Sequence, residues 1–294
     1  MSTGPIGARS SRGARRMVSA AVLAVAAWPA LAAPAPGPAE CRTAPPTGDS
    51  IASVGARGEM RLSSGGKAVL GSVRWPDEPA MAAAAYRFLA EFRGRPLVVT
   101  ARGEPDRWGR RRIDARLSGG DGAAEADLAE GLVAAGLAFA EADEGDVLCR
   151  PTLLSLEDAP RAAGTGVWAE PVAAAGDGPA LRGRAGRFTV VSGRLLHVGE
   201  RRARIYLDFA RRGEDGLTVI VSKRTWRRLL ERGLTAAGLT GRTVRARGIV
   251  EIRRGPTLDI ASAEAIQVLD DRDPAGVRAA PEGGEAEGER APRR

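Results

Sequence analysis

Carboxylates and arginines are the side chains with which this protein could do chemistry. His197 is the only histidine in the 294 residues, and Cys41 and Cys149 are the only cysteines. One histidine and two cysteines are too few for zinc sites of the Cys/His type, and they also argue against Ser-His-Asp triads and Cys-His dyads. Of the 44 basic residues only Lys67 and Lys223 are lysines. The excess of arginine is typical of a GC-rich genome and does not by itself indicate a function.

One tyrosine lies among arginines in the second half of the chain. On a strand over residues 203–209, alternation puts Arg204 and Tyr206 on the face opposite Ile205 and Leu207. Single-strand binding uses aromatic rings that stack on bases and cations that contact phosphates. The candidate contacts are Arg201, Arg202, Arg204, Tyr206, Arg211 and Arg212. The alternative is a solvated, arginine-rich face that reflects composition alone.

Charge is distributed unevenly along the chain. The net charge is +8, but residues 51–179 hold 15 basic and 19 acidic residues, whereas residues 180–269 hold 19 basic and 8 acidic residues. Only the second segment should therefore attract a polyanion. We expect single-stranded nucleic acid or another polyanion as the partner. A surface that docks on anionic lipid or on a protein is a further alternative.

The first 32 residues resemble a signal peptide. Four arginines precede an apolar run from residue 17 to 27, and Ala30 and Ala32 have the spacing that a signal peptidase accepts. The alternative is an uncleaved anchor, but the run is shorter than a membrane span needs. We expect a secreted or periplasmic protein without a transmembrane segment after cleavage. In an oxidising compartment Cys41 and Cys149 should form a disulfide, the alternative being two free thiols.

The expected organisation has six parts. They are the signal peptide (1–32), a proline-rich arm (33–50), a first domain (51–171), a linker (172–186), a basic barrel (187–269) and a disordered tail (270–294). The fold class is mainly β with α, that is, α+β.

Hydrophobic periodicity and turn residues predict the elements of the first domain. They are strands at 58–62, 67–74, 96–102 and 110–117 and helices at 79–93, 124–135 and after Cys149 as far as residue 163. The second segment reads as strands at 187–198, 203–209, 217–222, 243–253 and 257–261, with a helix at 224–232. Three strands, a helix and two strands is the order of a five-stranded oligonucleotide/oligosaccharide-binding (OB) barrel.

Several strings in residues 55–170 resemble the thermonuclease (staphylococcal-nuclease-like) family. They are Asp106-Arg107-Trp108-Gly109-Arg110, the helix-like stretch 125–138, Gly-Thr-Gly-Val-Trp at 164–168 and the stretch 70–77. The resemblance implies a first OB barrel with helices, and an exported bacterial homologue with a second OB-like barrel behind it.

The family hydrolyses phosphodiesters with calcium, so the resemblance assigns roles to individual residues. Arg110 matches a phosphate-binding arginine, Asp77 the position of the general base, and Glu59 that of the first metal-binding aspartate. Arg74 stands where the second metal-binding aspartate belongs, and Val69 replaces the other arginine. A fixed cation cannot replace a calcium ligand. We therefore expect no cofactor and a degenerate catalytic set.

The resulting hypothesis is an exported thermonuclease-like homologue that binds nucleic acid or another polyanion and is not an efficient nuclease. The alternative is an active calcium-dependent phosphodiesterase that uses Glu59, Asp77 and Arg110. The sequence indicates no oligomeric state.

Overall fold

The computed structural model describes residues 41–118, 126–142 and 147–269, which belong to one compact unit. The predicted signal peptide, residues 33–40 of the predicted proline-rich arm, the start of the helix predicted at 124–135 and the predicted disordered tail lie outside these residues. Within the described ranges, no helix has both the length and the apolar character to cross a membrane.

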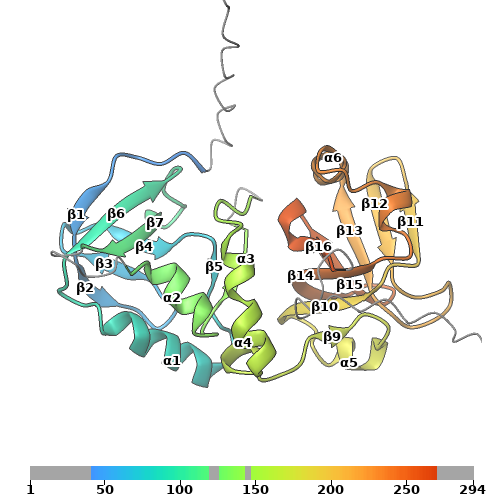
Figure 1. Ribbon diagram of the computed structural model, residues 1–294, viewed down its shortest axis with the longest axis horizontal. Helices are drawn as coiled ribbons and strands as arrows, with labels where there is room; N and C mark the ends of the chain where they lie inside the picture. The colour runs from blue at the N-terminus through green and yellow to red at the C-terminus, as the bar shows by residue number, and fades with distance from the viewer. Residues whose placement is uncertain (1–40, 119–125, 143–146, 270–294) are drawn as a thin grey trace, which may run out of the picture. The chain divides into compact units, whose positions relative to one another are not determined.

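A first β-barrel is built from residues 47–117 (Figure 1). Its strands are β1 (Thr47–Asp49), β2 (Ile51–Val54), β3 (Met60–Leu62), β4 (Lys67–Leu70), β6 (Leu97–Arg102) and β7 (Arg110–Leu117). Only Ser50 separates β1 from β2, so the two form one bent strand that pairs with β6 at one end and β3 at the other. This strand closes the sheet, whose order is β1-β6-β7-β4-β3-β2.

Four helices accompany the first barrel: α1 (Pro79–Ala90), α2 (Leu128–Ala134), α3 (Leu153–Leu156) and α4 (Asp158–Ala163). The Glu78 carboxylate caps α1 by accepting hydrogen bonds from the N–H groups of Ala80 (3.0 Å) and Met81 (2.8 Å). Gly94 follows α1 with a φ of +70°, a left-handed conformation that suits glycine and ends the helical region. Leu89 of α1 and Leu132 of α2 are fully buried in the barrel core.

A second barrel is built from β10 (Phe188–Arg194), β11 (His197–Glu200), β12 (Arg204–Asp208), β13 (Thr218–Ser222), β14 (Thr243–Ile252) and β15 (Pro256–Ile260), with β16 (Ile266–Val268) beside β14. Helices α6 (Lys223–Glu231) and α7 (Ala236–Leu239) lie between β13 and β14 in the chain. In Figure 1, α6 covers one end of β12 and β13, and its Trp226 and Leu229 are buried in the core.

Both barrels have the OB strand order, with the bent first strand counted once. In each, three strands form an antiparallel meander, and the third pairs in parallel with the last: β4 with β7, and β13 with β15. At least one helix follows the third strand in each barrel. The predicted fold class, an OB barrel with helices followed by a second OB-like five-stranded barrel, is therefore confirmed.

The structure differs from the expected elements in several places. The end of the predicted proline-rich arm forms β1 of the first barrel, β2 was not predicted, and the helix predicted after Cys149 is divided into α3 and α4. The segment predicted as a linker contains β9 (Ala173–Ala174), which pairs with β10, and α5 (Gly178–Arg182), whose Leu181 is fully buried. The strand predicted at 67–74 divides into β4 and β5 (Val73–Arg74) because Ser72 adopts a φ of 60°. The strand predicted at 187–198 divides at Leu195 and Leu196, and only then continues as β11.

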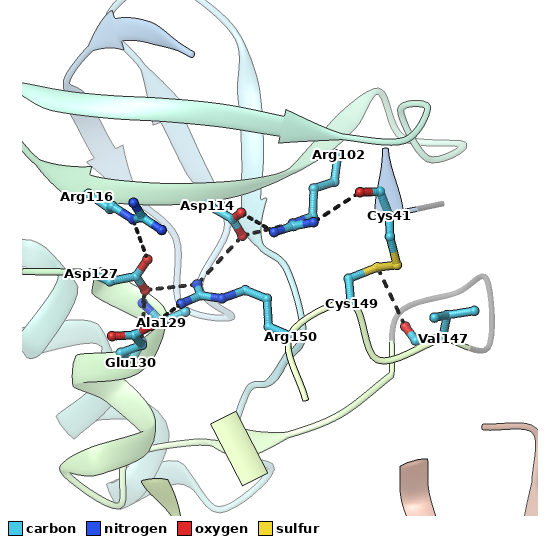
Figure 2. A network of polar contacts seen from close by, with 10 residues as sticks. All are labelled: Cys41, Arg102, Asp114, Arg116, Asp127, Ala129, Glu130, Val147, Cys149 and Arg150. Atoms are coloured by element: carbon cyan, nitrogen blue, oxygen red, sulfur yellow. Dashed lines mark hydrogen bonds and ion pairs between the residues drawn. A yellow bond between two sulfur atoms is a disulfide. The ribbon is translucent and has the colours of Figure 1, made fainter. Parts of the chain in front are cut away.

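A disulfide joins Cys41 and Cys149, as predicted, with Cα atoms 5.3 Å apart. Figure 2 shows a polar network beside it. Arg102 donates hydrogen bonds to the Cys41 carbonyl (3.2 Å) and to Asp114 (Nε to Oδ1, 3.1 Å). Arg150, next to Cys149, donates to Asp127 (2.9 Å). Burial alone would lower the pKa of Arg150, but the Asp127 hydrogen bond and nearby carboxylates outweigh it and raise the pKa.

Candidate functional site

The residues that the thermonuclease resemblance singled out lie in two separate hollows of the structure. Glu59 and Arg110 line one hollow on the first barrel, where Arg110 Nη1 lies 4.0 Å from Glu59 Oε1. Asp77 and Arg74 line the other. The hollow that holds Glu59 and Arg110 is thus not lined by the residue matched to the general base.

Arg110 is held firmly at the start of β7. Its Nε donates a 2.8 Å hydrogen bond to Asp106, whose side chain is only 2% exposed. Asp106 also accepts the backbone N–H groups of Trp108 and Arg110, each at 2.9 Å. Burial raises the pKa of Asp106, but these hydrogen bonds and the charge of Arg110 outweigh it, so the pKa lies below its ordinary value. The Asp106 carboxylate therefore stays ionised and holds the Arg110 guanidinium in place.

The first hollow is more basic than the segment charge suggests. Arg57, Arg61, Lys67 and Arg110 line it with Glu59 as its one acidic residue. The ring of Trp108, 51% exposed, lies at its edge, with the Arg110 guanidinium 4.7 Å from the ring centroid. The net negative charge of residues 51–179 therefore does not describe this local surface.

Arg74 neutralises the residue matched to the general base. Its Nη2 donates to both carboxylate oxygens of Asp77, at 3.2 and 3.1 Å, and its Nη1 lies 3.5 Å from Glu141. A guanidinium bound to Asp77 is not a calcium ligand, and it occupies the carboxylate that would otherwise accept a proton. In the described part of the chain, no three Asp, Glu, Cys or His side chains gather where they could hold a metal ion. The donor set present does not fit a calcium site.

A third hollow, of about 670 Å³, lies on the outer face of the second barrel. Its floor is the outer face of β11, β12 and β13, where Tyr206 pairs with Gly199 and Ile220. The predicted alternation is correct: Tyr206 and Arg204 are on the outer face, while Ile205 and Leu207 are fully buried. A Cβ at Gly199 would lie 3.2 Å from the His197 ring and 3.9 Å from Tyr206 Cβ, so the glycine chiefly leaves room for His197.

Two loops supply the cations of this hollow. Arg201 comes from the turn between β11 and β12, and Arg253 and Arg254 come from the turn between β14 and β15. Arg253 is paired with Glu251 (3.0 Å) and Asp259 (3.1 Å). Among the described residues, Arg201 and Arg254 have no carboxylate partner. Three arginines and one aspartate, Asp208, therefore line a face that also exposes an aromatic ring.

The other predicted contacts lie outside this hollow. Arg204 is on the same face as Tyr206 but is paired with Asp259 at 3.1 Å. Arg202 is exposed in the turn before β12, and Arg211 and Arg212 are exposed in the turn after it. The structure thus brings together Arg201 and Tyr206 but not the whole predicted set.

Sequence reasoning missed Arg253 and Arg254. The predicted strand order contained the signal, because the face and end loops of an OB barrel form its ligand surface, and the loop between the last two strands is one of them. Placing residues 253–256 in that loop would have selected both arginines.

The fold and the site define a protein of two OB-type barrels with one arginine-rich face on the second. No protein-family model matches the chain, and no curated protein matches it. Among solved structures, the chain is similar to the extended Tudor domain of Drosophila melanogaster Tudor-SN (p100), with 19% sequence identity and a TM-score of 0.28. The match covers 35% of this chain and 47% of that chain, so it spans less than half of the relative. Similarity at this level assigns neither a family nor a function.

Proposed function

We propose that this protein is an exported binding protein for single-stranded nucleic acid and that the outer face of its second barrel holds the strand. The observation that carries the proposal is the position of Tyr206 in a hollow that also contains Arg201 and Arg254, two guanidinium groups without a carboxylate partner among the described residues.

The chemistry of this face suits a flexible polyanion. A base stacked on Tyr206 gains about 1 to 3 kcal/mol whatever its identity, because every base has a π-face. Unpaired guanidinium groups can neutralise phosphates without first breaking an ion pair, and each neutralised phosphate releases counterions. A single strand satisfies both conditions, because its bases are unstacked and its phosphates lie close to them.

The first barrel supports binding more than hydrolysis. A fixed cation, Arg74, occupies the position matched to a metal-binding aspartate and holds Asp77 in an ion pair. Glu59 and Arg110 lie in a different hollow, with 4.0 Å between their charged atoms. Positioning errors near 1 Å can already cost about a hundredfold in rate. Export is a part of the proposal that agrees with the disulfide between the two cysteines.

The test compares the two tyrosines of the chain by fluorescence anisotropy with a labelled single-stranded oligonucleotide. Tyr206→Ala should weaken binding by about 1 to 3 kcal/mol, the contribution of one stacked base. Tyr86→Ala is the matched control, because Tyr86 is exposed on α1 of the first barrel and should leave affinity unchanged. Equal effects of the two substitutions would refute the assignment of the face. If no binding occurs at low salt, docking on anionic lipid or a protein replaces the proposal.

A further inference from the structure

The hollow that Arg74 and Asp77 line, of about 240 Å³, also combines aromatic rings with two further arginines that the comparison with the thermonuclease family did not single out. Its aromatic lining comes from both barrels and the segment between them: Trp75, Phe139, Trp168 and Phe188. Arg184 and Arg187, which precede β10, line it as well. Such a mixture is typical of a small-molecule site, which pairs apolar walls with a few placed polar groups.

The rings are held in place by one another. Phe139 lies edge-on to Trp168, with ring centroids 5.0 Å apart and an interplanar angle of 80°. It is also 5.3 Å from Phe188. The Trp75 indole N–H donates to the Ala56 carbonyl at 3.1 Å. These contacts fix the walls of the hollow before any ligand arrives, which lowers the entropic cost of binding.

One buried donor in this lining has no acceptor. Trp168 is 4% exposed, and within the described residues its indole Nε1 has no hydrogen-bond partner. A buried N–H without a partner costs free energy comparable to a lost hydrogen bond. The nitrogen atom is itself buried, so it is an unsatisfied donor in the wall of the hollow.

The arginines of the hollow are incompletely neutralised. Arg184 and Arg187 share a single carboxylate, Glu170, at 3.4 and 3.5 Å. Both distances exceed those of a direct charged hydrogen bond, about 2.7 to 2.9 Å, and the Glu170 side chain is 58% exposed. The other carboxylates of the hollow are already bound, Asp77 to Arg74 and Glu78 to the N–H groups that begin α1. A phosphate can therefore replace Glu170 at Arg184 and Arg187, because it carries more charge and more acceptor oxygens.

We propose that this hollow binds a nucleotide, with the base against the aromatic walls and the phosphate at Arg184 and Arg187 in place of Glu170. The shared chemistry is a flat aromatic ring joined to a phosphate, from a free mononucleotide or from the phosphorylated end of a strand. The site is distinct from the Tyr206 face, so its test does not depend on the proposed function.

The experiment is calorimetric titration of the full chain with adenosine 5′-monophosphate, adenosine and inorganic phosphate. The monophosphate should bind more tightly than either part alone. Arg187→Gln should weaken its binding at least about tenfold, the equivalent of one charge-assisted hydrogen bond. Glu170→Gln should strengthen it about three- to fivefold, because the competing exposed ion pair is removed. Arg111→Gln, an exposed arginine on β7, is the matched control.

The two sources of the ligand are separated with oligonucleotides that differ only in their 5′ end. A preference for the 5′-phosphorylated strand that Arg187→Gln abolishes would identify strand ends, and its absence alongside monophosphate binding would identify free nucleotides. The proposal is overturned if millimolar monophosphate gives no heat of binding, if adenosine or phosphate binds equally well, or if neither Arg187→Gln nor Glu170→Gln changes the affinity. Loss of monophosphate binding in Tyr206→Ala alone would move the site to the second barrel and would also overturn it.

Discussion

The guanidinium of Arg247 on β14 donates hydrogen bonds to both carboxylate oxygens of Glu157, each at 2.8 Å. Glu157 directly precedes α4, and the side chains are 0% and 3% exposed. The backbone of Ala140 completes the arrangement, because its N–H donates to Glu157 (2.8 Å) and its carbonyl accepts from Arg247 (2.9 Å). This buried pair connects the helices after the first barrel to a strand of the second.

Removing one charge of this pair should strongly destabilise the protein. Glu157→Gln leaves the Arg247 guanidinium buried without its counter-charge, and such changes cost about 3 to 5 kcal/mol. Glu251→Gln removes a carboxylate from an exposed pair with Arg253 and should cost less than about 1 kcal/mol. Urea unfolding monitored by circular dichroism measures both. If both variants lost a similar free energy of unfolding, the buried pair would contribute no more to stability than the exposed one, which would contradict this prediction.

The same pair affects how the second barrel should be studied. A fragment of residues 180–269 would leave Arg247 without Glu157 and would lack β9, which pairs with β10. Binding experiments on the full chain avoid both losses.

Reducing the disulfide should lower the free energy of unfolding by about 4 to 5 kcal/mol. Cys41 and Cys149 are 108 positions apart, and the entropy of closing so long a loop in the unfolded chain sets this magnitude. Denaturant titrations of the oxidised protein and the Cys41→Ser/Cys149→Ser variant give the difference. Two reactive thiols in protein purified from an oxidising compartment would contradict the pairing.

Asp106 should make stability depend on pH in the acid range. Its folded pKa lies below the ordinary value of 3.8, so its contribution is fully present above that value and is lost as the pH falls through the folded pKa. At neutral pH, Asp106→Asn should cost about 1.5 to 3 kcal/mol, the range for hydrogen bonds to a charged group. The cost should shrink once the pH is below about 3.8. A cost that is constant between neutral and acid pH would refute the role of the charge.

Much of the fold was predictable because both barrels follow local rules. Alternation identified the buried Ile205 and Leu207, and the order of strands and helices identified the OB topology. The breaks at Ser72 and Leu195 were not predictable, because the twist that bends a barrel strand is set by partners far away in the chain. The same holds for β9, whose pairing with β10 overrides a composition of alanine and glycine.

The site was predictable only in part. Tyr206 and Arg201 stood out because an aromatic ring and a cation lie close in sequence. Arg254 lines the same hollow although it is about fifty residues from Tyr206 in sequence. Arg204 forms an ion pair with Asp259, which lies on a strand far from it in sequence. Net charge by segment was also too coarse, since it hid the basic hollow around Arg110.

Calcium should neither raise the melting temperature nor support cleavage of single-stranded DNA above background. The reason is the guanidinium of Arg74, which pairs with Asp77 where the resemblance requires a metal ligand and a base. Digestion assays with calcium or with a chelator, together with thermal melts, measure this. If the wild-type protein cuts DNA only with calcium and Arg110→Ala abolishes cutting, the protein is a nuclease.

The salt dependence of binding to a single-stranded oligonucleotide tests the central claim most directly. Arg254→Gln should flatten the slope of log K against log salt by about 0.7, one phosphate contact. Tyr206→Ala should instead lower affinity by about 1 to 3 kcal/mol at every salt concentration, because stacking releases no counterions. Both changes on the full chain would place the strand on the outer face of the second barrel. Wild-type slopes and affinities in both variants would contradict that account.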